Sequence, residues 1–297
     1  MPHAPEISIV VPTRGGGELL SRLVGAVRAQ ATAHTFEILL VDSGSPREEL
    51  ERLAAAGGRI ESIAPGAFDH GLTRDHGARL ARGGVLVFLN QDALPVGERW
   101  LDGLVAPLLA PDPPAAVQGA IREFPDEELA RLGRRRFFWD SGGPRFYFTR
   151  ESRGWIERHG GIGFSTVHCA LRRDVWERQP FGPAPILEDK LWQKAAAARG
   201  WRIAAREPHE ALVWHTHDYD LRALRRRSVS EGFGWRRVGE RYRLGTAIAD
   251  AANRSVWREW RAARRSGRLE SAAERLFPLV RPVFLWWGNR WARGVQL

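Results

Sequence analysis

The pattern of apolar and polar positions in the first third of the chain alternates between two kinds of segment. Short runs of consecutive apolar residues predict buried strands, and they lie at residues 7–11, 36–41, 59–63 and 85–89. Residues 18–30 and 72–81 place apolar or small side chains at helical spacing and predict helices. This alternation predicts right-handed βαβ units, and therefore an α/β fold with a doubly wound, mostly parallel sheet and helices on both faces.

The pattern is less regular beyond residue 92. It predicts helices over residues 100–108 and 187–199, and strands over residues 115–120, 201–205 and 211–215. Residues 124–164 are rich in arginine, glycine and aromatic residues and show no clean period. From Asp220 onward the pattern predicts helix, and we expect Pro278 and Pro282 to interrupt any long helix there.

Polar side chains stand where the predicted strands end. Thr13 and Arg14 follow the first strand, Asp42 closes the second, and Gln91 and Asp92 follow the fourth. Because the carboxyl ends of parallel strands meet at one edge of a sheet, where open α/β sheets bind ligands, we expect Asp42 and Asp92 to face one crevice. An aspartate that only caps a turn is the alternative for Asp42 and for Asp92.

The chain of 297 residues is strongly basic, with a formal net charge of +10. Only Lys190 and Lys194 are lysine, so arginine carries nearly all of the positive charge. The planar guanidinium group suits phosphate recognition, which makes nucleotide phosphates, anionic lipid head groups and nucleic acid candidate partners. A compositional bias of the source is the alternative. The single cysteine, Cys169, excludes an intrachain disulfide and predicts a small buried thiol.

Five segments occur in the order typical of one enzyme family. They are VVPTRG (10–15), VDSGS (41–45), FDHGLTRDHG (68–77), FLNQDALP (88–95) and LEDKLW (187–192). Together they resemble family 2 glycosyltransferases of the GT-A fold, and the HG-x-TR block and the QDA triplet resemble the bacterial rhamnosyltransferase subgroup. The resemblance implies a GT-A domain over residues 1–220, with a nucleotide-sugar half (1–120) and an acceptor half (121–220). A helical extension rich in arginine and tryptophan follows at 221–297.

The resemblance implies an inverting transferase that uses a nucleotide-diphosphate sugar. It favours dTDP-L-rhamnose as the donor, with another nucleotide sugar such as UDP-glucose or UDP-galactose as the alternative. The implied donor contacts are Thr13, Arg14, Asp42, His70, Gly71, Arg74, Gln91 and Asp92. Arg74 near a helix N-terminus would meet a diphosphate with a positive side chain and backbone donors together, and a solvated surface arginine is the alternative.

A divalent metal, Mg²⁺ or Mn²⁺, is the implied cofactor, with Asp92 and His215 as its protein ligands. Magnesium typically binds one or two carboxylates together with substrate phosphate oxygens, so a lone carboxylate is chemically sufficient. The usual family motif is Asp-x-Asp, whereas this chain has Gln91, Asp92 and Ala93. His217 shares a strand face with His215 and is a supporting candidate.

The implied general base is Asp189, which would take the proton from the acceptor hydroxyl, with Glu188 and Trp192 supporting it. Adjacent helical residues point about 100° apart, so only one of Glu188 and Asp189 can face the crevice. Stabilisation of the helix dipole alone would also place two acidic residues in a first helical turn.

The implied acceptor is a hydroxyl of a cell-envelope polysaccharide or a lipid-linked glycan. The arginines and tryptophans after residue 220 suit a membrane-interface surface, and a packed helical cap or a homodimer contact are the alternatives. We expect a cytoplasmic protein, at the inner face of the cell membrane if that surface binds lipid, because no signal peptide precedes the first strand and no apolar run is long enough to span.

A non-catalytic module that binds anionic surfaces is the alternative from a different functional class. No nucleic-acid-binding motif is present, so we expect no nucleic-acid partner. The acidic residues stand at predicted strand ends rather than scattered, which favours the enzyme.

Overall fold

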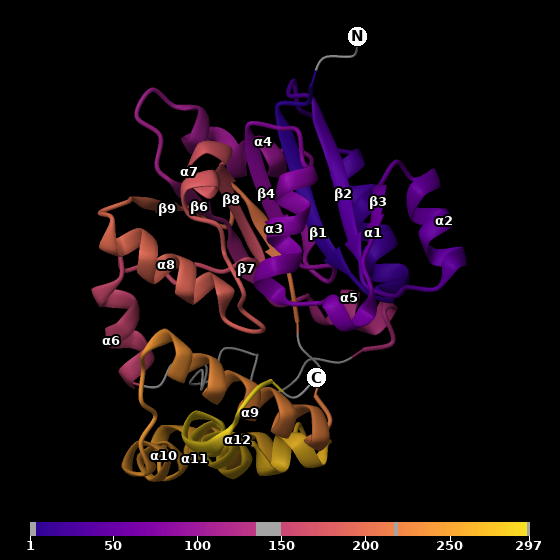
Figure 1. Ribbon diagram of the computed structural model, residues 1–297. Helices are drawn as coiled ribbons and strands as arrows, with labels where there is room; N and C mark the ends of the chain where they lie inside the picture. The colour runs from indigo at the N-terminus through magenta and orange to yellow at the C-terminus, as the bar shows by residue number, and fades with distance from the viewer. Residues whose placement is uncertain (1–3, 135–149, 217–218, 296–297) are drawn as a thin grey trace. The chain divides into compact units, whose positions relative to one another are not determined.

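The computed structural model describes residues 4–134, 150–216 and 219–295 (Figure 1). The chain divides into two compact units. The first comprises Met1–Arg122, His159–Ala184 and Glu188–His215, and the second comprises Glu123–Arg158, Pro185–Leu187 and Thr216–Leu297. The expected domain boundary at residue 220 stays a prediction.

The first unit is built on one large sheet. Within the described residues, seven strands pair in the order β3-β2-β1-β4-β8-β6-β9. They are β1 Ile7–Thr13, β2 Phe36–Asp42, β3 Arg59–Ser62, β4 Val85–Leu89, β6 Ala116–Gln118, β8 His168–Arg172 and β9 Ile203–Ala205. β1 is parallel to β2 and β4, whereas β8 is antiparallel to β4 and β6. The predicted doubly wound, mostly parallel sheet is confirmed.

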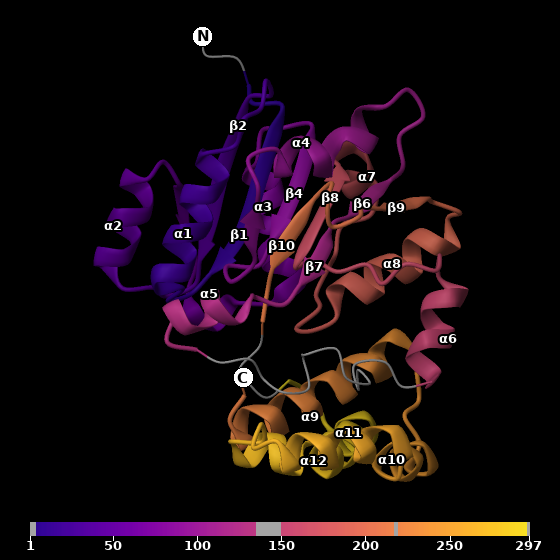
Figure 2. The ribbon, with the colours of Figure 1, turned by 180° about the vertical axis from the view of Figure 1, so that it is seen from behind.

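Helices cover both faces of this sheet, with α3 on one face and α1 on the other (Figures 1 and 2). The helices of this unit are α1 Gly17–Arg28, α2 Arg47–Ala55, α3 His70–Leu80, α4 Trp100–Val105, α7 Arg173–Arg178 and α8 Glu188–Ala198, with 3-10 turns at Pro65–Ala67 and Ala106–Leu109. All five residues of β4 are buried. Full burial of each large aliphatic side chain stabilises the fold by about 1.5–3 kcal/mol, so β4 anchors the core.

The helix predicted at residues 72–81 begins two residues earlier. Asp69 caps it, because its Oδ1 accepts hydrogen bonds from the backbone N–H groups of Gly71 and Leu72, each at 2.9 Å. His70 and Gly71 therefore belong to the first turn of α3 rather than to a preceding loop. The same oxygen accepts a hydrogen bond from Ala184 N at 2.9 Å, a long-range contact that the local sequence pattern does not contain.

The single strand predicted at residues 115–120 is two strands in different sheets. β6 ends at Gln118, and β7 (Ala120–Arg122) joins β5 (Leu94–Val96) and β10 (Leu212–Trp214) in a small sheet ordered β5-β10-β7. Gly119 lies between them against the ring of the buried His168, where a Cβ atom would overlap that ring. The chain can change sheets there because this position needs no side chain.

The second unit is helical. Its described helices are α5 Asp126–Arg131, α6 Arg150–Arg158, α9 Leu221–Val238, α10 Leu244–Ala251, α11 Arg254–Arg265 and α12 Ala272–Trp291. The expectation of helix from residue 220 onward is confirmed. In both views α9 and α12 run side by side, and α10 also packs on α12 (Figures 1 and 2). Among the helices of the described ranges, none combines the length and hydropathy that crossing a membrane requires.

The expectation that Pro278 and Pro282 interrupt a long helix is wrong. Both lie inside α12, on its buried face. Two glycines, Gly232 in α9 and Gly288 in α12, bring the helix backbones into direct contact, because a Cβ atom at either position would overlap a carbonyl oxygen of the opposite helix. Packing of one helix along the other supplies most helical stability in proteins, and here it outweighs the hydrogen bonds that proline removes.

Candidate functional site

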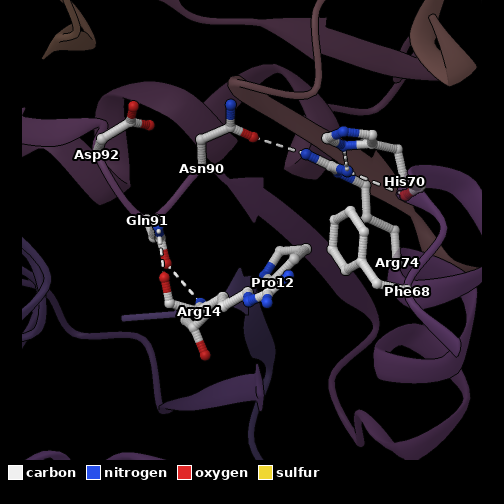
Figure 3. A pocket seen from close by; sticks show the side chains of 9 residues that line it. Pro12, Arg14, Phe68, His70, Arg74, Asn90, Gln91 and Asp92 are labelled. Carbon is white, nitrogen blue, oxygen red and sulfur yellow. Dashed lines mark hydrogen bonds between the residues drawn. The ribbon is translucent and has the colours of Figure 1, made fainter. Parts of the chain in front are cut away.

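A cavity of about 200 Å³ opens at the carboxyl ends of β1 and β4 (Figure 3). The described residues that line it are Pro12, Thr13, Arg14, Phe68, His70, Arg74, Asn90, Gln91 and Asp92. Six of the eight predicted donor residues are in this set, and they come from three segments that are far apart in the sequence. The parallel register of β1 and β4 and the N-terminus of α3 bring these segments together.

Arg74 is a buried side chain held in one position. Only 2% of it is exposed, so a solvated surface arginine is excluded. Its Nη2 donates to Asn90 Oδ1 at 2.6 Å, and its Nη1 donates to the His70 carbonyl oxygen at 2.9 Å. Nη1 also lies 3.1 Å from Oε1 of Glu188. These contacts fix a guanidinium group at the cavity wall, next to the first turn of α3.

Glu188 supplies the negative charge that balances Arg74. The Glu188 side chain is 6% exposed, and Thr166 Oγ1 donates a hydrogen bond to it at 2.6 Å. Burial raises the pKa of Glu188, but the guanidinium group of Arg74 outweighs burial and holds the pKa below its usual value. Glu188 is therefore a carboxylate at neutral pH, and Arg74 is oriented by an ion pair inside the protein.

Gln91 joins the loop after β4 to the loop after β1. Its Oε1 accepts from Arg14 N at 2.7 Å, and its Nε2 donates to the Arg14 carbonyl oxygen at 3.3 Å (Figure 3). The side-chain amide thus fixes the Arg14 backbone through both of its polar ends. This contact gives Gln91 a structural role at the cavity, in the triplet where the usual family motif has a carboxylate.

Asp92 and His215 are neighbours in space although 123 positions separate them in the sequence. His215 follows β10, and its Nε2 lies 3.3 Å from Asp92 Oδ1. The Asp92 side chain is 35% exposed and the His215 side chain 7%. A carboxylate oxygen and an imidazole nitrogen therefore converge at the edge of the cavity. No group of three His, Cys, Asp or Glu residues suitable for a metal occurs among the described residues, and His217 lies outside them.

Asp42 and Gly71 are not among the described lining residues. The Asp42 carboxylate accepts hydrogen bonds from Gly44 N at 2.9 Å and from the backbone and hydroxyl of Ser45, so it holds the turn after β2. Gly71 faces the segment 182–184, where a Cβ atom would overlap the carbonyl oxygen of Gly182. The structure gives both residues local roles, and their contact with a donor stays a prediction.

Asp189 is buried beside Lys190. The ammonium group lies 3.3 Å from Asp189 Oδ2 and also donates to the carbonyl oxygen of Phe164. Burial raises the pKa of Asp189, and Lys190 only partly offsets this effect. A carboxylate with a raised pKa suits proton transfer near neutral pH. Asp189 is not among the described residues that line the cavity, and its catalytic role stays a prediction.

Trp192, on the same helix as Asp189, is a core residue. Its side chain is buried against Phe164, with ring centroids 4.9 Å apart, and its indole N–H donates to the carbonyl oxygen of Gln179 at 2.8 Å. It anchors α8 to the body of the first unit. Any support that it gives to Asp189 acts through the position of that helix.

Sequence reasoning missed three residues of this region. Phe68 lines the cavity and meets the His70 ring edge-on, with centroids 5.0 Å apart. Asn90 holds Arg74, and Lys190 pairs with Asp189. The position of Asn90 directly after β4 indicates it, by the same reasoning that places Gln91 and Asp92 at the sheet edge. Nothing in the sequence pattern indicates the partner of Lys190.

Residues 8–179 match the protein family described as Glycosyl transferase family 2, which is more than half of the chain. The chain belongs to glycosyl transferase family 2. The matched range of this family includes every lining residue of the cavity, whereas Asp189 and His215 lie beyond it.

Two curated proteins are similar to part of the chain. Validoxylamine A glucosyltransferase of Streptomyces hygroscopicus subsp. jinggangensis is 29% identical over 166 residues, which is 48% of this chain and 39% of that protein. An O-antigen biosynthesis protein of Myxococcus xanthus is 32% identical over 132 residues, 43% of this chain and 10% of that protein. The chain thus spans well under half the length of these curated relatives.

Solved structures extend the likeness to the whole chain. A mannosyltransferase of Pyrobaculum calidifontis, solved in complex with GDP-Man and Mn²⁺, superposes with a TM-score of 0.61 at 16% identity. The superposition covers 98% of this chain and 89% of the mannosyltransferase. Identity at this level shows the fold alone, and it confirms the GT-A architecture predicted from the sequence.

Proposed function

We propose that this family 2 member is an inverting glycosyltransferase. It moves L-rhamnose from dTDP-L-rhamnose onto a hydroxyl of a cell-envelope polysaccharide or a lipid-linked glycan, with Mg²⁺ or Mn²⁺ as cofactor. The observation that carries the proposal is the cavity itself, which is lined by the fixed guanidinium group of Arg74 and by Asp92, with His215 Nε2 lying 3.3 Å from the Asp92 carboxylate.

Arg74 is suited to bind the diphosphate of the donor. Its guanidinium group is already oriented by Glu188, Asn90 and the His70 carbonyl oxygen, so little side-chain entropy is lost when an anion binds. Thr13 and Arg14 also line the cavity, and we expect them to contact the nucleotide.

Asp92 and His215 fit a site for a hard divalent cation. Together they offer one carboxylate and one imidazole nitrogen, and donor phosphate oxygens and water would supply the other ligands. His215 would ligate through Nε2 with its proton on Nδ1. When bound, the cation neutralises negative charge on the departing diphosphate. Two protein ligands are too few to hold the cation tightly in the absence of nucleotide. We therefore expect the metal and the nucleotide-sugar donor to bind together.

Asp189 is proposed as the general base. The acceptor hydroxyl oxygen attacks the anomeric carbon as the bond from this carbon to the diphosphate oxygen breaks, which inverts the configuration. The Asp189 carboxylate takes the hydroxyl proton, and its raised pKa favours this transfer at neutral pH. Lys190 holds the carboxylate in place until the acceptor binds.

The choice of rhamnose rests on the resemblance of the HG-x-TR block and the QDA triplet. The relatives support a second candidate donor, because one is named a glucosyltransferase and the mannosyltransferase was solved with GDP-Man. The Myxococcus relative, named for O-antigen biosynthesis, supports a cell-envelope polysaccharide as the acceptor.

Thermal unfolding with dTDP, UDP or GDP, each with and without Mn²⁺, tests the donor. A nucleotide at about a hundred times its dissociation constant stabilises the folded protein by about 2.7 kcal/mol, which raises the unfolding midpoint by several degrees. We expect the largest shift with dTDP and Mn²⁺. Asp92→Asn should reduce it, and Asp112→Asn, at a side chain that is 93% exposed, should not.

The outcomes of this experiment separate the candidates. A preference for UDP or GDP would retain the transferase and replace the sugar. No shift with any nucleotide would overturn the proposal and favour a module that binds anionic surfaces. Asp189→Asn should keep the nucleotide shift and lose about 10²- to 10⁴-fold in turnover, whereas full turnover would refute its role as base.

A further inference from the structure

The outward side of α12 carries a row of exposed apolar side chains. Their spacing of three or four residues places them on one stripe of the helix, about 22 Å long. They are Leu276 (42% exposed), Leu279 (46%), Val283 (49%), Trp287 (44%) and Trp291 (51%). The opposite stripe of α12 is buried, so the exposed stripe is the face of the helix that a partner can contact.

The neighbouring helix α10 also exposes large apolar side chains. Leu244 and Ile248 are 52% and 60% exposed, and α10 packs against α12. These two helices therefore expose seven large apolar side chains of one compact unit. A concentration of this kind on a protein surface marks an interaction site.

A cavity of about 520 Å³ lies at the Leu276 end of the stripe. The described residues that line it are Trp260, Arg264, Gly267, Leu269, Arg275 and Leu276, and none of them is acidic. Arg264 lies over the Trp260 ring at 5.4 Å, and Arg275 Nε donates to the Leu269 carbonyl oxygen at 3.2 Å. Leu276 belongs to both the cavity and the stripe, so the apolar surface leads directly to two guanidinium groups.

The surrounding segment is strongly positive. Residues 241–297 contain twelve arginines, four acidic residues and no lysine. On α11, Arg254, Arg258 and Arg261 are exposed at helical spacing. A second copy of this chain on the stripe would bring two such segments together and repel itself. An anionic lipid surface complements both features, because apolar side chains enter its head-group region while arginine meets its phosphates.

We propose that the exposed face of α10 and α12 docks on an anionic membrane surface, and that Arg264 and Arg275 receive a lipid phosphate in the cavity at its end. Helix α12 lies in the plane of the membrane rather than across it, because its other side buries the charged Arg281 against Glu231 of α9. The proposal concerns the second unit alone and does not depend on which sugar the first unit transfers.

Vesicle co-sedimentation of the full chain tests the docking face. The vesicles are phosphatidylcholine alone, or an equal mixture of phosphatidylcholine and phosphatidylglycerol. We expect binding to the mixed vesicles. The double variant Val283→Glu and Trp287→Glu should weaken it by more than about tenfold, because two half-exposed apolar side chains no longer enter the head-group region. The matched control is Leu109→Glu, at a side chain of the first unit that is 51% exposed, and it should bind as the unchanged protein does.

The arginine-lined cavity is tested separately. Arg264→Gln and Arg275→Gln should each reduce binding to the mixed vesicles by about fivefold, and added salt should reduce the difference. Circular dichroism checks that every variant is folded.

Three results would overturn the proposal. The first is no sedimentation with the mixed vesicles, and the second is equal binding by the stripe variant and the Leu109→Glu control. The third is a dimer, seen by light scattering, that the stripe variant abolishes while no vesicle binding is found.

Discussion

Replacing Glu188 with glutamine removes the carboxylate that balances Arg74 in the interior of the first unit. The two side chains are 6% and 2% exposed, and Oε1 and Nη1 are 3.1 Å apart. In the Glu188→Gln variant, Arg74 keeps its neutral acceptors, Asn90 Oδ1 and the His70 carbonyl oxygen, but loses its counter-charge. Breaking a buried ion pair in this way costs about 3–5 kcal/mol of stability, because one charge is left uncompensated.

A double-mutant cycle isolates this term. We expect Arg74→Met and Glu188→Gln each to lower the free energy of unfolding by about 3–5 kcal/mol in the absence of nucleotide. The double variant should cost no more than one single variant, since it leaves no buried charge alone. The coupling energy is then at least about 3 kcal/mol. Urea unfolding followed by tryptophan fluorescence and circular dichroism measures each free energy.

The exposed pair Arg47 and Glu51 on α2 is the matched control. Its side chains are 91% and 61% exposed at a spacing of four residues, so its coupling energy should not exceed about 0.5 kcal/mol. If the costs at Arg74 and Glu188 simply add, within about 0.5 kcal/mol, the ion pair does not hold the Arg74 side chain and the reasoning about the cavity wall is refuted.

Three further predictions concern other parts of the molecule. Gly71→Ala should lower the unfolding midpoint, at a cost of about 2 kcal/mol or more from the backbone overlap, while Gly66→Ala, which meets no atom within 4 Å, should leave it nearly unchanged. Burial raises the pKa of Glu231, but the guanidinium groups of Arg281 and a second arginine outweigh burial and lower this pKa to about 2. Because this pKa lies below the ordinary value of 4.5, the ionised Glu231 contributes stability above pH 4.5, and the contribution is lost as the pH falls towards 2. Acid titration of helix content by circular dichroism should show this loss, and the Glu231→Gln variant should lack it. Burial raises the pKa of the Cys169 thiol, so alkylation should be slow in the folded protein and fast in urea, and rapid labelling without denaturant would contradict the buried position.

Local periodicity predicted the four strands up to β4 and the helices α1 and α3, because each of these elements has a regular pattern of buried residues. It also placed Gln91 and Asp92 at the end of β4, since a strand that is buried along its whole length must end where its apolar run ends. The edge of the sheet that holds the cavity follows from the same reasoning, because parallel strands end together.

Errors arose where distant contacts outweigh local preference. The early start of α3 is set by the local Asp69 cap, whereas the change of sheet at Gly119 depends on the ring of the distant His168. Helix α12 continues through Pro278 because α9 packs along it. At Gly119 and at Pro278 the deciding partner lies at least forty residues away, outside any window over which periodicity is read.

The sequence by itself determined which residue types stand at the sheet edge, and therefore that charged side chains gather there. Only the tertiary structure decided which of these residues pair with each other. It turned Glu188 towards Arg74 and Asp189 towards Lys190, and it joined Asp92 to His215 across 123 positions. The physical reason is that a buried charge destabilises the fold unless an oppositely charged group lies beside it. The path of the chain through the whole sheet, and not the local pattern, determines which oppositely charged side chain is within reach.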